Sequence, residues 1–563
     1  MHDRKIRELV NPRKLFMKNF ISAIIILGYI FLGCNNSKNT AIETNQETSI
    51  TSKITYSDLI LKETEIADFF KSFPEEQSIV AEVNLFYKNR NYQYAWFNKN
   101  GMTSTVSSFE NQLNNYHDNY LDNSLINNRI GILISKIQND KADAKIYESR
   151  ITELELLLTT TFFKYSKKVF TGIYENPKNL DWYIPKNKKN YQVLLDSLVD
   201  SKKNNNLWEP SNKYYIALKQ KLICYREIEK NGGFPKVILS KKSLSITEKD
   251  SCLVNVKRYL TLSGDLKNND KSIQFTDSLV KAVSRFQTRM GLNNQGILGE
   301  ATIKEMNVPI SFRIKQIMIN MERLRWFPDQ VEDDFLLINI PEYKLHVFEN
   351  KQKVMDLKVI VGKEATRTSI FKGNISQLIL NPYWNVPTSI VRKEMLPKLK
   401  RNSNYLSKNN MELLSGNTII DPSTVNWNKY TSSIPYSIRQ KPGDDNALGK
   451  MKFIFPNNFS IYLHDTPSRS IFNESKRAFS HGCIRVENPM KLAQYILRNN
   501  QKWNSDNLQS KIESKKTISI QIKPTLPVYI VYFTTWIGNS GEINFRNDLY
   551  NMDSQLEKEI FNN

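Results

Sequence analysis

Apolar residues recur at helical spacing along the first half of the chain. They lie three and four positions apart in the stretch 79–97 and again in 151–170, and such a period predicts helices that bury one face. The segment 56–240 contains no chemical motif, so its role is inferred only from its position. We expect a helical scaffold domain over 56–240.

A second helical pattern occupies 245–308 and has defined ends. Thr276 stands where an N-cap is expected, and Gly291 stands where the helix would stop. A glycine-rich turn and another short helical pattern follow. We expect a separate small domain here, followed by a linking helix within 309–334. The apolar face of the first helix would be formed by Val280, Val283, Phe286 and Met290.

Alternation of apolar and polar residues replaces the helical period after residue 335. The stretch 388–433 interrupts it with helical or irregular patterning, which predicts an insertion that caps the sheet. The chain thus predicts a multidomain α+β protein with a β-rich domain at 335–540 and a C-terminal extension at 541–563. The expected strands are 336–341, 344–350, 353–362, 376–387, 459–466, 516–522 and 527–537.

The N-terminus resembles a lipoprotein export signal. An apolar run at 20–33 follows several basic residues and is shorter than the roughly 20 residues that a membrane span needs. It ends in Gly33 and Cys34, as in a lipobox, although Met17 would give a more usual start. We expect a signal peptide at 1–33, a lipid on Cys34 and a flexible tether at 34–55. The alternative is an uncleaved N-terminal anchor.

This signal would place the protein on the periplasmic side of a bacterial membrane, held through its lipid, with the inner or outer membrane left open. The net charge is +22, but lysines are spread along the chain without a nucleic-acid motif, so we expect no nucleic-acid partner. A basic protein suits an anionic lipid surface or wall polymer. In that compartment Cys224 and Cys252 could form a disulfide or remain free thiols.

One cysteine lies in a setting typical of a nucleophile. Cys483 falls on a short loop between a predicted strand and the helix that Asn488 and Pro489 begin. A histidine within reach could take the thiol proton, and His464 fits better than His481, which is only two residues from Cys483. A zinc site formed by these three side chains has none of the common ligand spacings, so we expect no metal and no other cofactor.

The wider sequence around Cys483 resembles a known enzyme family. His464, the fifteen residues 465–479 and then the run SHGC match the signature of the L,D-transpeptidase catalytic domain. The flanking YLHDTP, IRVENP and NPYWNVP resemble the large branch of that family. Members of that branch carry a scaffold region, a peptidoglycan-binding module and a capping insertion in the order found here. The likeness covers most of the chain after residue 56.

The resemblance implies a role for each matching residue. Cys483 would be the acyl-accepting nucleophile and His464 its base, oriented through a backbone carbonyl. Arg485 would hold a substrate carboxylate through paired hydrogen bonds, with an ion pair to Glu487 as the alternative. The oxyanion side and wall of the site would be formed by Ser480, His481 and Gly482, and the pocket would be lined by Tyr462 and Trp384.

The domain at 245–308 resembles the three-helix peptidoglycan-binding module. Its FQ pair at 286–287, the GL at 291–292 and the glycine turn at 296–299 match that module's pattern. The usual acidic residue before the turn is Gln295 here, so packing against neighbours without ligand binding stays an alternative.

The family resemblance implies a reaction in two halves. Cys483 would attack a tetrapeptide stem at the L-centre of its diamino acid, and the acyl group would pass to a second stem. Peptidoglycan stem peptides are then the partners, carbapenems are expected covalent inhibitors, and cell wall biogenesis is the process. Two alternatives remain open: an L,D-carboxypeptidase that uses water as acceptor, and a wall-binding lipoprotein without catalysis.

Overall fold

The fold comes from a computed structural model. It describes residues 57–139, 143–174, 176–186, 190–199, 209–210 and 212–561. The predicted signal peptide, the lipidation at Cys34 and the tether therefore lie outside the described residues. No helix in these ranges is long and apolar enough to cross a membrane.

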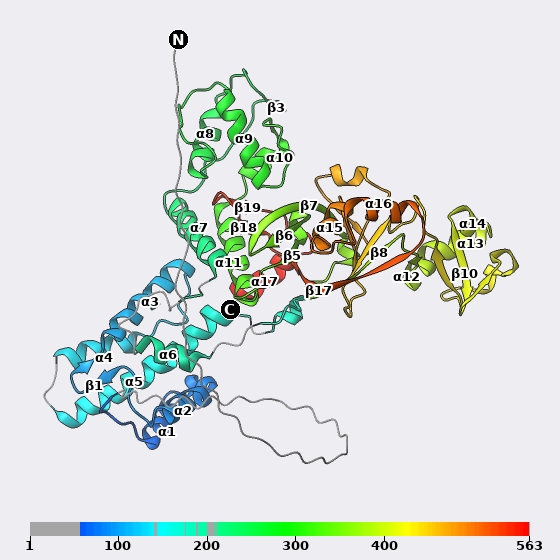
Figure 1. Ribbon diagram of the computed structural model, residues 1–563. Coiled ribbons are helices and arrows are strands. Elements are labelled where there is room, and N and C mark those ends of the chain that lie inside the picture. The colour runs from blue at the N-terminus through cyan, green and yellow to red at the C-terminus, as the bar shows by residue number, and fades with distance from the viewer. Residues whose placement is uncertain are drawn as a thin grey trace, which may run out of the picture. The chain divides into compact units, whose positions relative to one another are not determined.

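Helices dominate the region predicted as a scaffold (Figure 1). A two-stranded hairpin, β1 (Phe97–Asn98) and β2 (Gly101–Met102), interrupts them. The longest helix, α5, is buried over most of its second half. The helices are α1 (Glu63–Ser72), α2 (Val80–Asn89), α3 (Ser104–Tyr120), α4 (Asn128–Asn139), α5 (Ala144–Ser166), α6 (Tyr191–Val199) and α7 (Lys213–Lys230).

The module that follows has three helices, α8 (Leu253–Leu262), α9 (Asp277–Arg289) and α10 (Glu300–Met306). Gln287 of the FQ pair is buried and holds the glycine turn together: its Nε2 donates to the Ile297 carbonyl at 2.7 Å, and its Oε1 accepts from the Gly296 amide at 2.8 Å. The glutamine in this motif therefore acts on the module's own backbone.

The helix predicted as a linker is instead part of the core. α11 (Ile310–Trp326) is buried along most of its length, including several charged side chains. It packs against α7 and against α17 (Met552–Phe561). The predicted C-terminal extension is likewise integral, because β18 (Thr535–Ile537) pairs with β19 (Ile543–Phe545) across the expected boundary at 540. Both segments carry polar residues that are buried in the structure, although in the sequence they resemble surface residues.

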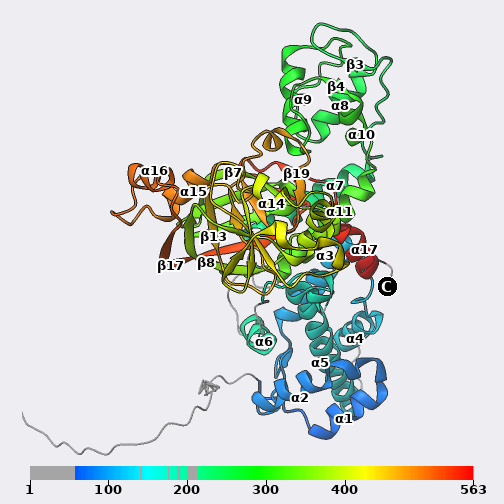
Figure 2. The ribbon, with the colours of Figure 1, turned by 90° about the vertical axis from the view of Figure 1, so that its right-hand side faces the viewer.

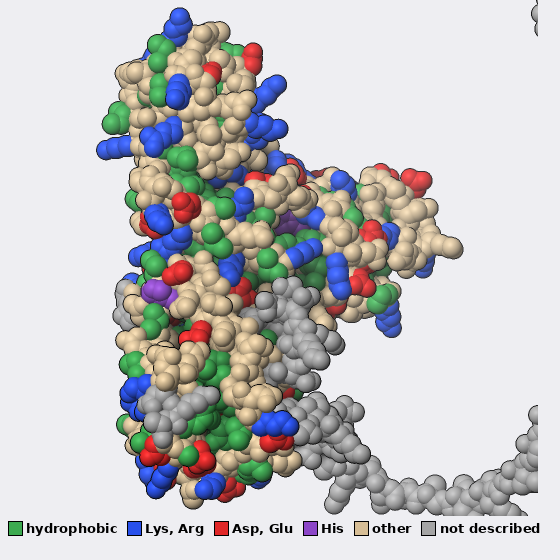
Figure 3. Space-filling view, turned by 90° about the vertical axis from the view of Figure 1, so that its left-hand side faces the viewer, with side chains coloured by type: hydrophobic (Ala, Val, Ile, Leu, Met, Phe, Trp, Pro, Cys, Tyr) green, Lys and Arg blue, Asp and Glu red, His purple; other side chains and the backbone are tan. Residues whose placement is uncertain are grey.

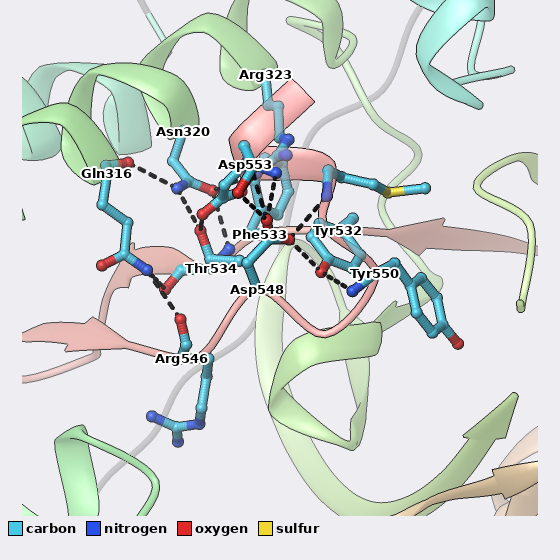
Figure 4. A network of polar contacts seen from close by, with 12 residues as sticks. Gln316, Asn320, Arg323, Tyr532, Phe533, Thr534, Arg546, Asp548, Tyr550 and Asp553 are labelled. Carbon is cyan, nitrogen blue, oxygen red and sulfur yellow. Dashed lines mark hydrogen bonds and ion pairs between the residues drawn. The ribbon is translucent and has the colours of Figure 1, made fainter. Parts of the chain in front are cut away.

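Those buried polar side chains satisfy one another (Figure 4). Arg323 Nη1 lies 2.5 Å from Asp553 Oδ1. Thr534 Oγ1 donates to the other Asp553 oxygen at 2.6 Å and accepts from Asn320 Nδ2 at 2.7 Å. The Thr534 amide donates back to Asn320 Oδ1 at 2.9 Å. Helices α11 and α17 are thus linked to Thr534, the residue before strand β18, by a network with hydrogen-bond partners for each charge.

The β-rich domain forms a sheet that closes on itself. Its strand order is β15-β7-β16-β14-β13-β8-β17-β5-β6, and β6 also pairs with β7. Figure 2 shows α15 (Pro489–Ile496) and α16 (Ser505–Glu513) beside these strands. The strands are β5 (Phe335–Asn339), β6 (Lys344–Glu349), β7 (Gln352–Gly362), β8 (Lys372–Leu380), β13 (Met451–Ile454), β14 (Leu463–His464), β15 (Ala478–Ser480), β16 (Ile484–Val486) and β17 (Ile518–Val531).

This sheet confirms the predicted α+β class and differs from the expected strands in detail. The two predicted strands at 516–522 and 527–537 are largely one, β17, which runs through two prolines. Strand β13 was missed. Its alternate residues Met451 and Phe453 are buried in the core, whereas Lys452 lies on the opposite face.

The insertion is a subdomain with strands of its own, and its sheet extends on both sides beyond the expected 388–433. It contains a sheet of order β11-β10-β12-β9, formed by β9 (Trp384–Asn385), β10 (Met411–Ser415), β11 (Thr418–Ile420) and β12 (Ser437–Gln440). It also has a separate apolar core that includes Leu399, Leu413 and Trp427. The helices α12 (Thr388–Ile390), α13 (Leu396–Arg401) and α14 (Tyr405–Lys408) gather beside β10 in Figure 1. The insertion therefore contains the expected helices and, in addition, a sheet that the sequence pattern did not predict.

Asp553→Asn should lower the free energy of unfolding by about 3 kcal/mol, because it leaves the buried Arg323 guanidinium without a counter-charge. The measurement is urea unfolding followed by circular dichroism. The matched control is Glu557→Gln on the same helix, which removes a more exposed pair with Lys315 and should cost less than about 1 kcal/mol. Equal effects of the two substitutions would contradict the role assigned to the network.

Candidate active site

Strand pairing brings the predicted catalytic residues together. β14 pairs in parallel with β16, with Leu463 opposite Ile484 and His464 opposite Arg485. The Ile484 amide donates to the Tyr462 carbonyl at 3.1 Å. Cys483, the residue before this strand, therefore lies beside the segment that carries His464.

The backbone fixes the tautomer of His464. Its Nδ1 lies 2.5 Å from the carbonyl oxygen of Asp465. A carbonyl can only accept, so Nδ1 carries the hydrogen and Nε2 presents a lone pair. The Asp465 carboxylate is used elsewhere: it accepts from the Lys450 amide at 2.8 Å and pairs with Arg469 at 2.5 Å. Asp465 thus shapes the turn and orients His464 through its main chain.

The loop before Cys483 is held by hydrogen bonds to the backbone. Ser480 Oγ donates to the Cys483 carbonyl at 2.6 Å and accepts from the Gly482 amide at 3.2 Å. Thr368 Oγ1 donates to the Gly482 carbonyl at 2.8 Å. Gly482 has φ +112°, and a Cβ there would lie 3.3 Å from the Arg367 carbonyl oxygen. This position therefore requires glycine.

These contacts give the loop residues Ser480 and His481 surroundings that differ from the shared site wall expected for them. Ser480 is buried and acts as a brace for the turn. With the Gly482 and Ile484 amides occupied, the Cys483 amide has no hydrogen-bond partner among the described residues. His481 points elsewhere: it is exposed, and its Nε2 lies 3.0 Å from Glu394 Oε1 of the insertion.

Burial and charge set the protonation states of the pair. Burial, followed by the positive charges of Arg485 and Lys452, lowers the pKa of His464 to about 3. Burial also raises the pKa of the Cys483 thiol, although hydrogen bonding to Tyr462 and the same two cations act in the opposite direction. At neutral pH these shifts favour a protonated Cys483 thiol and a neutral His464 imidazole.

Arg485 has no carboxylate partner within the described ranges. Its Nε is buried without a hydrogen bond, and Glu487, the alternative partner, pairs with Lys358 at 3.1 Å. Lys452, which we did not predict, is also without a carboxylate; its Nζ lies 4.0 Å from the centre of the Tyr462 ring. Alternation in MKFIF could have revealed Lys452, because it interrupts an otherwise apolar strand.

The two predicted pocket aromatics have different places. The Tyr462 ring lies 5.6 Å from the His464 ring, centre to centre. Trp384 lies on β9 and packs against the apolar core of the insertion, so its contacts belong to that subdomain. The sequence did not show this, because NPYWNVP looked like one continuous strand.

The two other cysteines within the described ranges, Cys224 and Cys252, do not pair with each other. Cys224 is exposed and Cys252 is buried, and both are free thiols. Within the described ranges no three His, Cys, Asp or Glu side chains cluster in a way that could hold a metal ion. Lys and Arg side chains stand at many separate points across the face shown in Figure 3, with Asp and Glu among them.

Comparisons with protein families match three parts of the chain. Residues 333–530 match the L,D-transpeptidase catalytic domain and residues 81–222 match the scaffold domain. Residues 252–306 match the family described as "Putative peptidoglycan binding domain". The family resemblance stated from the motifs is confirmed by these matches.

Individual relatives agree with this assignment. The chain is 36% identical over 256 residues to a Haemophilus influenzae protein named "Putative L,D-transpeptidase", which is 45% of this chain and 50% of that protein. The chain thus spans half the length of that relative.

Parts of the chain are also similar to two solved L,D-transpeptidases. The protein from Mycobacterium smegmatis has a TM-score of 0.18 and 10% identity, over 35% of this chain and 58% of its own. The protein from Stackebrandtia nassauensis has a TM-score of 0.21 and 11% identity, over 52% of this chain and 97% of its own.

The protonation states make a prediction for thiol reactivity. Because the thiolate is the reactive form and the pKa of Cys483 is raised, alkylation by iodoacetamide should accelerate about tenfold per pH unit from pH 7 to pH 9. Mass spectrometry of the Cys483 peptide measures the rate, with the exposed Cys224 as a reference in the same digest. A plateau of fast alkylation below pH 7 would indicate a thiolate–imidazolium pair and overturn the assignment.

Proposed function

We propose that this chain, which carries an L,D-transpeptidase catalytic domain together with a scaffold domain and a peptidoglycan-binding domain, cross-links peptidoglycan stem peptides through an acyl-enzyme on Cys483. The observation that carries the proposal is the strand pairing that brings the segment of His464 beside Cys483, with Nδ1 of His464 held by the Asp465 carbonyl so that Nε2 presents its lone pair. In such a pair the histidine can take the proton from the thiol and later give it to the leaving group.

The first half-reaction consumes a tetrapeptide stem. Cys483 Sγ attacks the carbonyl carbon at the L-centre of the diamino acid, and its proton passes to His464 Nε2. The bond to the terminal D-alanine breaks, and the leaving amine takes that proton from the imidazolium. The products are a thioester on Cys483 and free D-alanine, with His464 neutral again.

The tetrahedral intermediate needs donors for its oxyanion. The Cys483 amide has no hydrogen-bond partner among the described residues, and donors already in place cost no reorganisation during the reaction. The half-buried cations Lys452 and Arg485 add a favourable field for negative charge. We assign the oxyanion position to the Cys483 amide; Ser480 and Gly482 hold that amide in place.

The second half-reaction forms the cross-link. The side-chain amine of a second stem attacks the thioester carbonyl, and His464 accepts the amine proton. The carbon–sulfur bond breaks, Cys483 is released, and the proton returns to the thiolate. The product is an amide between two diamino acids, and no cofactor takes part.

The other domains support action at the cell wall. A peptidoglycan-binding module would keep the chain on its substrate polymer, and a lipid on Cys34 would hold it at the periplasmic face of a membrane. Wall biogenesis is then the process served. A strained β-lactam carbonyl would acylate Cys483 by the same first step, so carbapenems should act as covalent inhibitors.

The purified protein should form a Cys483 adduct with a carbapenem and release D-alanine from tetrapeptide stems. Stem dimers joined between two diamino acids should appear, and Cys483→Ala should abolish adduct and dimer. Mass spectrometry measures both. Tripeptides without dimers would indicate a carboxypeptidase. Wall binding without any adduct would overturn the enzymatic proposal.

A further inference from the structure

We propose that Lys452 forms a second carboxylate subsite beside Cys483, which selects donor stems whose diamino acid bears a free carboxylate on its side chain. This inference rests on the proposed function and deepens it. Arg485 alone was expected to hold substrate charge, and nothing in the family signature pointed to Lys452.

The strand register places Lys452 in line with the catalytic base. Lys452 of β13 is opposite His464 of β14, which is opposite Arg485 of β16. Residues opposite each other in a sheet project from the same face. One row therefore carries a cation, the imidazole and a second cation. Because neighbouring strands lie about 4.8 Å apart, the two cationic residues are about 10 Å apart along the row.

Lys452 differs from neighbouring lysines in having no carboxylate partner among the described residues. Other cations near the site are paired: Lys450 with Asp444 at 3.2 Å and Lys358 with Glu487 at 3.1 Å. Lys452 has no carboxylate partner among the described residues, although burial is enough to lower its pKa. A partly desolvated ammonium group without a counter-charge costs free energy. A bound ligand that supplies a negative charge would offset this cost and would explain why a lysine stands at this position.

The ammonium group is positioned toward the reacting centre. Its Nζ lies over the Tyr462 ring at 4.0 Å, and that ring neighbours His464. Lys452 and Cys483 are close enough to affect each other's ionisation. A cation held over an aromatic face keeps its N–H donors for another partner. Lys452 is therefore placed to bind a substrate anion next to the thiol.

The donor stem offers two anions when its diamino acid is a dicarboxylic acid. One is the carboxylate of the terminal D-alanine, and the other is the carboxylate at the far end of the diamino acid's side chain. The planar fork of Arg485 suits the first, and the point charge of Lys452 suits the second. Amidation of the side-chain carboxylate removes its charge, so Lys452 would discriminate between the two forms of the wall polymer.

The test compares two synthetic tetrapeptide stems that differ only in this carboxylate, free or amidated. The unmodified protein should prefer the free form in kcat/KM by on the order of tenfold, the usual effect of one charge-assisted hydrogen bond. Lys452→Met should lose that preference through a higher KM for the free form. Lys452→Arg should retain it. Lys450→Met removes a nearby charge that pairs with Asp444 and should leave the preference unchanged.

A binding measurement separates recognition from thiol chemistry. Calorimetry on the Cys483→Ala protein should show tighter binding of the free stem than of the amidated stem, and Lys452→Met should remove that difference. If Lys452→Met instead slows both stems equally and shifts the alkylation profile of Cys483, Lys452 acts only on the thiol and the subsite is wrong. If neither stem acylates Cys483, the proposed function itself fails.

Discussion

The site depends on one structural constraint, the parallel pairing of β14 with β16. A parallel pair cannot be joined by a tight turn, so the chain between His464 and Cys483 must leave the sheet and return. The fifteen residues 465–479 make that crossover. The long spacing that identifies the motif is therefore the length of chain needed to bring the base and the nucleophile side by side.

The same constraint explains why many side chains near the site form hydrogen bonds with main-chain groups. Asp465 turns the chain away from β14 while its carbonyl holds His464, and a Cβ on Gly449 would come within 2.4 Å of the Asp465 carboxylate. Ser480 and Thr368 fix the returning loop. Burial and the positive charges of Arg485 and Lys452, which have no carboxylate partner among the described residues, then keep the imidazole neutral, so the proton needed for the reaction rests on the thiol.

Sequence patterns were sufficient wherever local residues determine the structure. The cap of α15 is an example: the Asn488 side chain accepts from the Lys491 amide at 3.1 Å, as its position predicted. The candidates His464 and Cys483 came instead from a motif whose long spacing is the crossover between β14 and β16. The alternation in MKFIF marks Lys452 as a polar residue in an apolar strand, but its place beside His464 and Arg485 follows only from the register across three strands, which hydrophobic periodicity does not specify.

Contacts between residues far apart in the sequence also explain why α11 and the C-terminal segment looked exposed: their polar side chains are buried by distant partners. α11 carries charges that look solvent-exposed in sequence, yet Arg323 finds Asp553 some 230 positions later. Arg546 of the C-terminal segment donates to the Arg289 carbonyl at 2.8 Å, and Gly291 leaves room for its side chain. The C-terminal segment thus contacts the peptidoglycan-binding module while it also packs on α11. The segments predicted as a linker and an extension therefore contact the scaffold helix α7, the peptidoglycan-binding module and each other.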